Sequence, residues 1–102
     1  MAQKDTQSGI KERTKLRVKT PRKYKAILIN DDFTPMDFVV TILTQVFKKS
    51  EPEAVKIMLD VHHKGTGVAG VYTLDEALTR TNRAMQWARD EGFPMRMKCE
   101  PE

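Results

Sequence analysis

A short apolar run that ends in a cluster of polar residues limits the possible folds of this chain most strongly. Residues 24–29 are mostly apolar and form a run no longer than a strand, which is typical of a strand buried in the middle of a sheet. Asn-Asp-Asp-Phe-Thr-Pro-Met-Asp follows at 30–37, and the apolar residues after it recur at helical spacing. Residues 30–37, the junction, therefore connect a strand to a helix and concentrate hydrogen-bond acceptors at one end of the sheet.

The junction ends in residues that favour the start of a helix. Thr34 is predicted to be the N-cap, Pro35 the first helical residue and Asp37 the acid at N3, as in a capping box. The broad apolar stripe that follows predicts a helix that continues to about Lys48, where basic side chains suit the negative end of the helix dipole.

Two more helices have similar start signals. Ser50 and Glu53 form a second capping box, and Gly65 marks the end of that helix. Thr-Leu-Asp-Glu at 73–76 is a third capping box, and it predicts a helix that runs to about Asp90. The residues of this last helix expected to face the core are Leu74, Ala77, Leu78, Ala84, Met85 and Ala88.

Two further segments are predicted to be strands. Residues 68–72 are apolar and short, and residues 94–100 alternate so that Met95, Met97 and Cys99 share one face. The predicted order is β-α-α-β-α-β. The fold class is therefore α+β, a single domain in which a three-stranded sheet packs against three helices.

Charge separates the N-terminal segment from the rest of the chain. Residues 1–23 carry eight lysines and arginines against two acids, a net charge of +6, whereas residues 24–102 carry a net charge of −2. The first segment has few apolar side chains and no helical or strand period, so we expect a disordered basic extension at 1–23 and a folded domain at 24–102. The extension could be a solvated leader, a basic arm for nucleic acid or a handle gripped by another protein.

Composition excludes several classes of protein. No apolar run approaches the roughly 18–20 residues of a membrane span, and the N-terminus has no secretory signal pattern, so no membrane partner is expected. Cys99 is the only cysteine, which excludes an internal disulfide and a cysteine-based zinc site. These features predict a cytoplasmic protein.

The polar residues of the junction could bind a cation together with His62. An amide oxygen from Asn30, the carboxylates of Asp31 and Asp32 and a neutral imidazole of His62 would all accept hydrogen bonds from an ammonium group. An apolar cleft between the first two helices could take an apolar side chain beside that cation. The residues predicted to line the cleft are Met36, Val39, Met58 and Val61.

The same residues are also compatible with simpler structural roles. The junction could be an ordinary polar turn, and His62 could be a helix-terminal residue bonded to backbone. A divalent metal would need about six oxygen ligands, more than Asp31 and Asp32 supply, so no metal and no cofactor is expected. A nucleophilic pair of Cys99 and His62 has no support from spacing, and 65–67 is too short for a phosphate loop.

Three motifs resemble the ClpS family of bacterial and organellar adaptors. They are Tyr-Lys-x-x-x-x-Asn-Asp-Asp-aromatic-Thr-Pro-Met-x-Phe-Val at 24–39, Met-Leu-x-Val-His at 58–62 and Gly-Val-x-Thr at 70–73. The resemblance covers about residues 24–100. It implies an adaptor and not an enzyme, one that binds proteins with N-terminal Leu, Phe, Tyr or Trp (N-degrons). It also implies delivery of these proteins to the N-terminal domain of the AAA+ unfoldase ClpA, or a homologue, for degradation by ClpP.

The resemblance also implies a role for each site residue. Asn30, Asp31 and His62 would contact the substrate α-amino group, and Met36 would exclude Val and Ile at the pocket mouth. The other residues expected to contact the peptide or line its pocket are Asp32, Thr34, Leu28, Ile29, Val39, Met58, Val61 and Met95. The residues expected to face the unfoldase are Phe33, Asp75 and Arg80.

A monomer without a nucleic-acid partner is expected. Two alternatives from different functional classes stay open: a small RNA-associated α+β domain that uses its basic extension, and a metal-dependent enzyme at Asp31 and Asp32. Salt-sensitive RNA binding would indicate the first. A divalent ion that depends on both aspartates would indicate the second.

Overall fold

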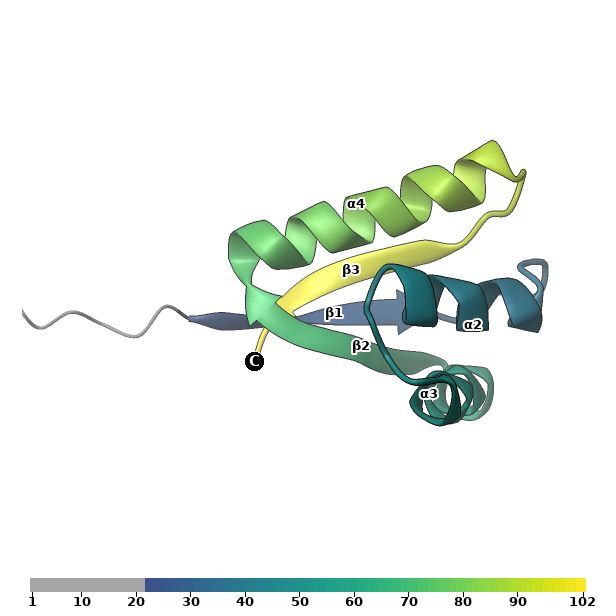
Figure 1. Ribbon diagram of the computed structural model, residues 1–102, viewed down its shortest axis with the longest axis horizontal. Helices are drawn as coiled ribbons and strands as arrows, with labels where there is room; N and C mark the ends of the chain where they lie inside the picture. Colours follow the sequence, from purple (N-terminus) through teal and green to yellow (C-terminus); the bar gives the residue numbers. More distant parts are fainter. Residues whose placement is uncertain (1–21) are drawn as a thin grey trace, which may run out of the picture.

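The computed structural model describes residues 22–102 and confirms the predicted order of elements (Figure 1). The elements are β1 (Lys23–Ile29), α2 (Met36–Gln45), α3 (Glu51–Lys64), β2 (Thr66–Thr73), α4 (Leu74–Asp90) and β3 (Arg96–Pro101). The three strands form one antiparallel sheet, so the α+β class is confirmed. The expectation of disorder before the domain concerns residues 1–21, which lie outside the described residues. Lys23, also assigned to the extension, begins β1.

β1 is the central strand of the sheet, which accounts for its apolar character. The strand order is β2-β1-β3, and Ala26, Ile27 and Leu28 are all buried. Ala26 pairs with Cys99 and Leu28 with Met97, so two of the three alternate residues predicted for this strand share one face; the third, Met95, lies just before β3, which begins at Arg96. The pairing with β2 shifts between Ala26 and Ile27, and this bulge bends the strands next to the junction.

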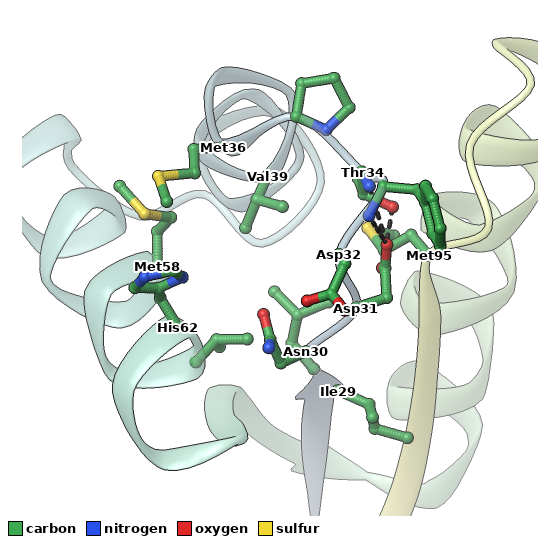
Figure 2. A pocket seen from close by; sticks show the side chains of 14 residues that line it. Ile29, Asn30, Asp31, Asp32, Thr34, Met36, Val39, Met58, His62 and Met95 are labelled. Atoms are coloured by element: carbon green, nitrogen blue, oxygen red, sulfur yellow. Dashed lines mark hydrogen bonds between the residues drawn. The ribbon is translucent and has the colours of Figure 1, made fainter.

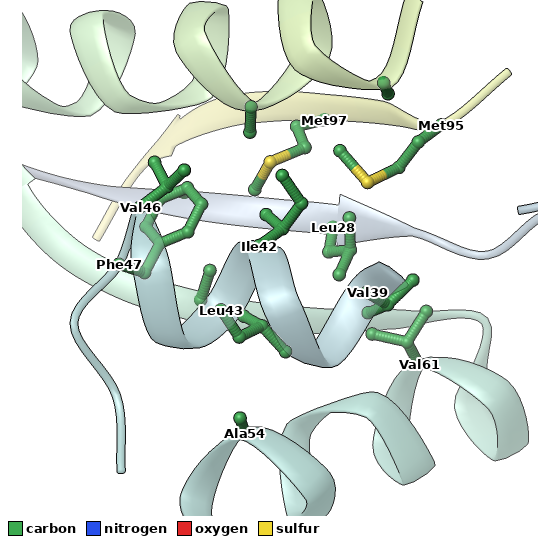
Figure 3. Close-up of a cluster of buried hydrophobic side chains, with 14 residues drawn as sticks. Leu28, Val39, Ile42, Leu43, Val46, Phe47, Ala54, Val61, Met95 and Met97 are labelled. Atoms are coloured by element: carbon green, nitrogen blue, oxygen red, sulfur yellow. The ribbon is translucent and has the colours of Figure 1, made fainter. Parts of the chain in front are cut away.

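The core lies between the sheet and the helices (Figure 3). Figure 3 shows Ile42 of α2 next to Leu28 and Met97, and Leu43 on the side of α2 toward α3; all four side chains are at most 7% exposed. The buried face of α4 is made of small residues, namely Ala77, Thr81, Ala84 and Ala88, which let this helix approach the sheet closely. Leu74 and Leu78 were predicted to face the core, and this was wrong: they are 40% and 42% exposed because they lie beside that small-residue stripe.

The capping box of α3 is confirmed. The Ser50 hydroxyl accepts a hydrogen bond from the Glu53 backbone N–H at 3.3 Å, and the Ser50 N–H donates to the Glu53 carboxylate at 3.3 Å. Gly65 ends the helix with φ 93°, a left-handed conformation that favours glycine. Both ends of α3 are therefore defined by local sequence. The position of its C-terminal end sets where the last turn of α3 lies relative to the junction.

Neither of the other two predicted capping boxes forms a side-chain cap hydrogen bond. α2 begins at Met36, its N-cap is Pro35 without a side-chain hydrogen bond, and the Thr34 hydroxyl instead donates to Asp31. Thr73 is the N-cap of α4, as predicted, and α4 ends at Asp90, but the Thr73 side chain makes no cap hydrogen bond; Thr73 is also the last residue of β2 and pairs with Lys23. α2 ends at Gln45 and not near Lys48, since Lys48 has left-handed backbone with φ 58°.

No helix among residues 22–102 combines the length and the apolar character that crossing a membrane requires.

Candidate binding pocket

A pocket of about 330 Å³ opens where β1 ends and the junction begins (Figure 2). Its size is at the lower end of the range for sites that hold a small ligand or a side chain. The structure brings together every residue that the sequence predicted for ligand binding, and it adds Phe33 and Pro35. The lining residues are Leu28, Ile29, Asn30, Asp31, Asp32, Phe33, Thr34, Pro35, Met36, Val39, Met58, Val61, His62 and Met95.

Asp31 holds the junction in shape. Its Oδ1 accepts hydrogen bonds from the backbone N–H groups of Phe33 at 2.8 Å and Thr34 at 2.7 Å, and its Oδ2 accepts from the Thr34 hydroxyl at 2.8 Å. This is an Asx turn, in which the side chain satisfies backbone donors that no strand or helix reaches. Asp31 and Thr34, which were both predicted to contact the ligand, therefore hydrogen-bond to each other.

The same hydrogen bonds keep Asp31 ionised. Burial acts to raise the pKa of its carboxyl group, but the bonds from Thr34 and Phe33 and the positive charge of Arg96 together lower the pKa below its ordinary value. A negative charge is thus fixed at the wall of the pocket at neutral pH. It attracts a cation without needing a direct contact.

Asn30 and His62 come from different elements and meet at the same pocket. The Asn30 backbone N–H donates to the Gly65 carbonyl at 2.9 Å, which joins the end of β1 to the end of α3. His62 lies in the last turn of α3, three residues before Gly65. Figure 2 shows both side chains at the same side of the opening.

Several acceptors of the pocket are free to bind a ligand. Within residues 22–102, no hydrogen bond involves the side-chain amide of Asn30, the Asp32 carboxylate or the His62 ring. His63, the neighbouring histidine, has its ring centroid 5.3 Å from that of His62 but does not line the pocket. This makes His63 a natural control for the role of His62.

The apolar residues of the pocket form a floor and a mouth. Leu28, Val39, Val61 and Met95 are between 1% and 9% exposed, so they form a buried floor. Met36 is 47% exposed and lies at the mouth, in the first turn of α2. The pocket can therefore bury an apolar side chain while Asn30 and His62 hold a polar group near the solvent.

The residues expected to face the unfoldase do not form one cluster. Phe33 is 79% exposed at the rim of the pocket, after the C-terminal end of β1, whereas Asp75 is in the first turn of α4. Figure 1 shows these two places at opposite ends of the sheet. Arg80 contacts its own domain: it binds Glu76 at 2.8 Å, donates to the Val46 carbonyl and lies over the Tyr72 ring at 4.9 Å.

Two features near the site were not predicted from the sequence. Pro35 lines this pocket and also a shallower depression with Asp37, Phe38, Thr41 and Phe93. Phe38 makes edge contacts with Trp87 and Phe93, at centroid distances of 5.7 and 4.9 Å, which attach α2 to α4 behind the mouth. These aromatic residues are widely spaced in the chain, so no local pattern joins them.

A metal site has no support in the described part of the chain. Among residues 22–102, no group of three or more His, Cys, Asp or Glu side chains is placed to hold a metal ion.

Known proteins are similar to this chain in both sequence and fold. The family model described as ATP-dependent Clp protease adaptor protein ClpS matches residues 19–98. The ATP-dependent Clp protease adapter protein ClpS of Deinococcus radiodurans is 54% identical over 91 residues, which cover 89% of this chain and 79% of that protein. The corresponding protein of Acetivibrio thermocellus is 48% identical over 93 residues, which cover 91% of this chain and 94% of that protein.

A solved structure has the same fold. Agrobacterium tumefaciens ClpS2 bound to L-phenylalaninamide matches with a TM-score of 0.79 and 37% sequence identity, over 81% of this chain and 100% of that chain. The fold and the pocket define a small binding protein, with hydrogen-bond acceptors placed beside a buried apolar floor. The chain belongs to the ClpS family of ATP-dependent Clp protease adaptors, and it is an adaptor and not an enzyme.

Proposed function

We propose that this adaptor binds proteins through a free α-amino group and a bulky apolar N-terminal side chain, and delivers them to the AAA+ unfoldase of the Clp protease. The observation that carries the proposal is the pairing of Asn30 and His62 with a buried apolar floor in one pocket. The solved ClpS2 structure supports it, because L-phenylalaninamide offers an α-amino group and one apolar side chain. N-terminal Leu, Phe, Tyr and Trp have the required size.

Each polar residue has a defined part in this proposal. The ammonium group donates hydrogen bonds to the Asn30 amide oxygen and to an unprotonated nitrogen of His62. Asp31 contributes its fixed negative charge, and Asp32, which is exposed, adds a second one. Thr34 is half-buried at the pocket wall, where the peptide would pass after its first residue.

The expected energies show that both halves of the pocket are needed. Burying one Leu or Phe side chain is worth roughly 1.5–3 kcal/mol. Hydrogen bonds to a charged amine add about 1.5–3 kcal/mol each. Micromolar affinity needs about 8 kcal/mol after the costs of ordering, so neither the floor nor the acceptors suffice alone.

This division of energy gives specificity for a free N-terminus. An acetylated N-terminus loses its charge and two of its donors, and it leaves the acceptors of Asn30 and His62 unpaired. An internal Phe fits the floor but brings no ammonium group. The pocket therefore distinguishes a degradation signal from an ordinary exposed Phe by polar contacts and not by apolar area.

Delivery would use surfaces away from the floor. Asp75 is exposed in the first turn of α4, and Phe33 is exposed at the rim, so both are available to an unfoldase of the ClpA type and its N-terminal domain. The basic segment before Lys23 would be the handle that the unfoldase grips. The protein would act as a monomer, since each copy holds a complete pocket.

The direct test is a titration with short peptides that differ only at the first residue or its acetylation. Peptides that begin with Phe or Leu should bind at micromolar concentration or tighter, a Met-starting peptide should bind more weakly, and N-acetylation should abolish binding. Equal binding of free and acetylated Phe peptides would refute the proposal.

A further inference from the structure

The apolar part of the pocket contains three thioether groups, from Met36, Met58 and Met95. They lie at different depths: Met36 is 47% exposed at the mouth, Met58 is half-buried and Met95 is 4% exposed in the floor. Phe33 lies out at the rim, and the deeper apolar lining besides the methionines is aliphatic, from Leu28, Ile29, Val39 and Val61. In this deeper lining, only the sulfur atoms differ in chemistry from plain hydrocarbon. They are therefore the groups that can distinguish an aromatic ligand from an aliphatic one.

The methionines stand on two sides of the space that a ligand would fill. Figure 2 shows Met36 and Met58 on the side formed by α2 and α3, and Met95 on the opposite side, behind Thr34. Met95 precedes β3, which pairs with the central strand, so its backbone is anchored to the sheet. Met58 and Met95 therefore line the pocket from two different parts of the chain, α3 and the segment before β3.

A thioether interacts more favourably with an aromatic ring than with an alkyl group. Its sulfur is polarizable and makes favourable contacts with ring edges at about 5 Å, which an aliphatic chain cannot reproduce. Methionine is also unbranched, so it adapts to a flat ring. Apolar area alone separates Phe from Leu only weakly, because burying either side chain is worth a similar amount.

We propose that Met58 and Met95 make this pocket selective for aromatic N-terminal side chains, such as Phe, over Leu. The inference rests on the proposed function and names the preferred substrate class of the same pocket. Met36 contributes less because nearly half of its side chain is exposed to solvent.

The test uses three peptides that differ only in the first residue: Phe, cyclohexylalanine and Leu. Cyclohexylalanine has a six-membered ring of similar size but no aromatic electrons, so it isolates the sulfur–aromatic contact from size and apolar area. The wild-type protein should bind the Phe peptide about threefold to tenfold more tightly than the cyclohexylalanine peptide and the Leu peptide. Met95→Leu and Met58→Leu, which nearly conserve volume, should each bring that ratio closer to one, and the double variant closer still.

Met97→Leu is the matched control. Met97 lies two residues after Met95, in β3, belongs to the same buried cluster, is 7% exposed and does not line the pocket. This variant loses a buried thioether without changing the pocket, so its affinity ratio should equal that of the wild-type protein. Thermal unfolding of all variants shows whether each is folded, and the half-buried Met58 supplies a testable variant should Met95→Leu fail to fold.

The possible results separate the inference from the proposed function. A wild-type ratio near one, or a ratio that Met58→Leu and Met95→Leu leave unchanged, would overturn the inference while free-amine peptides still bind. A change in ratio of the same size in Met97→Leu would also overturn it, because general packing would then be the cause. Failure of every free-amine peptide to bind would overturn the proposed function itself.

Discussion

The carboxylate of Asp31 binds Thr34 twice, accepting from its backbone N–H at 2.7 Å and from its hydroxyl at 2.8 Å. These bonds, with a third from the Phe33 N–H, fix the path of the chain between the central strand and α2. The pocket wall depends on this path, because Asn30 precedes the turn and Met36 follows it. The polar turn therefore serves both the fold and the candidate site.

Replacing Asp31 should weaken the junction. Asp31→Ala removes three acceptor contacts and leaves the half-buried Thr34 N–H without its partner, so the free energy of unfolding should fall by about 1–2 kcal/mol. Asp32→Ala is the matched control, since Asp32 is exposed and its change should stay within about 0.5 kcal/mol. Urea unfolding measures both. Equal effects of the two substitutions would show that the turn does not depend on Asp31.

The stabilisation by Asp31 should also depend on pH. Its pKa in the folded protein lies below the ordinary value of 3.8, so its contribution is fully present above that value. The contribution is lost as the pH falls through the lower, folded-state pKa. The difference in unfolding free energy between the wild-type protein and Asp31→Asn should therefore be constant at neutral pH and shrink below pH 3.8. A difference that stays constant into strong acid would contradict this assignment.

The sequence predicted the elements well and the details of their ends poorly. The capping box of Ser50 is local, with no competing partner nearby, and it was confirmed. Thr34 has the same start signal, but its hydroxyl donates to Asp31 and does not accept from the first turn of α2, and a sequence pattern does not show which partner a threonine hydroxyl takes. Leu74 and Leu78 fitted a helical apolar stripe, yet the sheet accepts only the narrower alanine stripe of α4.

The candidate site was predictable in parts. The junction could be identified locally, because Asn30, Asp31 and Asp32 follow a buried strand. His62 and Met58 come from another helix, and periodicity alone does not show that α3 ends beside the junction. The contact that brings them there is the bond from the Asn30 N–H to the Gly65 carbonyl, between residues far apart in the chain. The residue types alone allowed this convergence as one hypothesis beside simpler structural roles, and the resemblance to a family favoured it.

Ligand binding should weaken in mild acid if His62 acts as the acceptor that the proposed function requires. A neutral imidazole nitrogen accepts a hydrogen bond, whereas an imidazolium ring has no acceptor and repels an ammonium group. Affinity for a Phe-starting peptide should fall about tenfold or more from pH 7 to pH 5. Asp31 stays ionised over this range, because its pKa is lowered.

Two variants test whether the pH dependence of peptide affinity comes from the His62 ring. His62→Ala should bind weakly at both pH values and lose the pH dependence. His63→Ala should keep it, although its ring centroid is only 5.3 Å from that of His62. An unchanged affinity of the wild-type protein between pH 7 and pH 5 would show that His62 does not act as the acceptor.

Met36 should control which side chains enter the pocket. Its side chain is 47% exposed in the first turn of α2, at the mouth, where under the proposed function it would restrict the width available next to the ligand Cβ. Met36→Ala should therefore admit peptides that begin with Val or Ile, which branch at Cβ, with a gain of about tenfold or more. Competition binding against a Phe-starting peptide measures the gain, and Val55→Ala, an exposed position on α3 outside the pocket, is the control. Continued rejection of Val and Ile by Met36→Ala would show that another residue restricts the mouth.

Arg80 should stabilise the folded domain, whether or not it also contacts a partner. Its guanidinium joins α4 to the end of α2 through the Val46 carbonyl, binds Glu76 at 2.8 Å and packs on Tyr72 at 4.9 Å, with only 23% of the side chain exposed. Arg80→Met keeps the aliphatic stem but leaves the Val46 carbonyl unpaired, so the free energy of unfolding should fall by about 1–3 kcal/mol. Asp75→Ala, in the exposed first turn of the same helix, should change stability by less than about 0.5 kcal/mol. Peptide affinity should be the same in both variants, because neither residue lines the pocket. If Arg80→Met unfolds like the wild-type protein while delivery to the unfoldase is lost, Arg80 acts at the partner interface and not as a tie between the two helices.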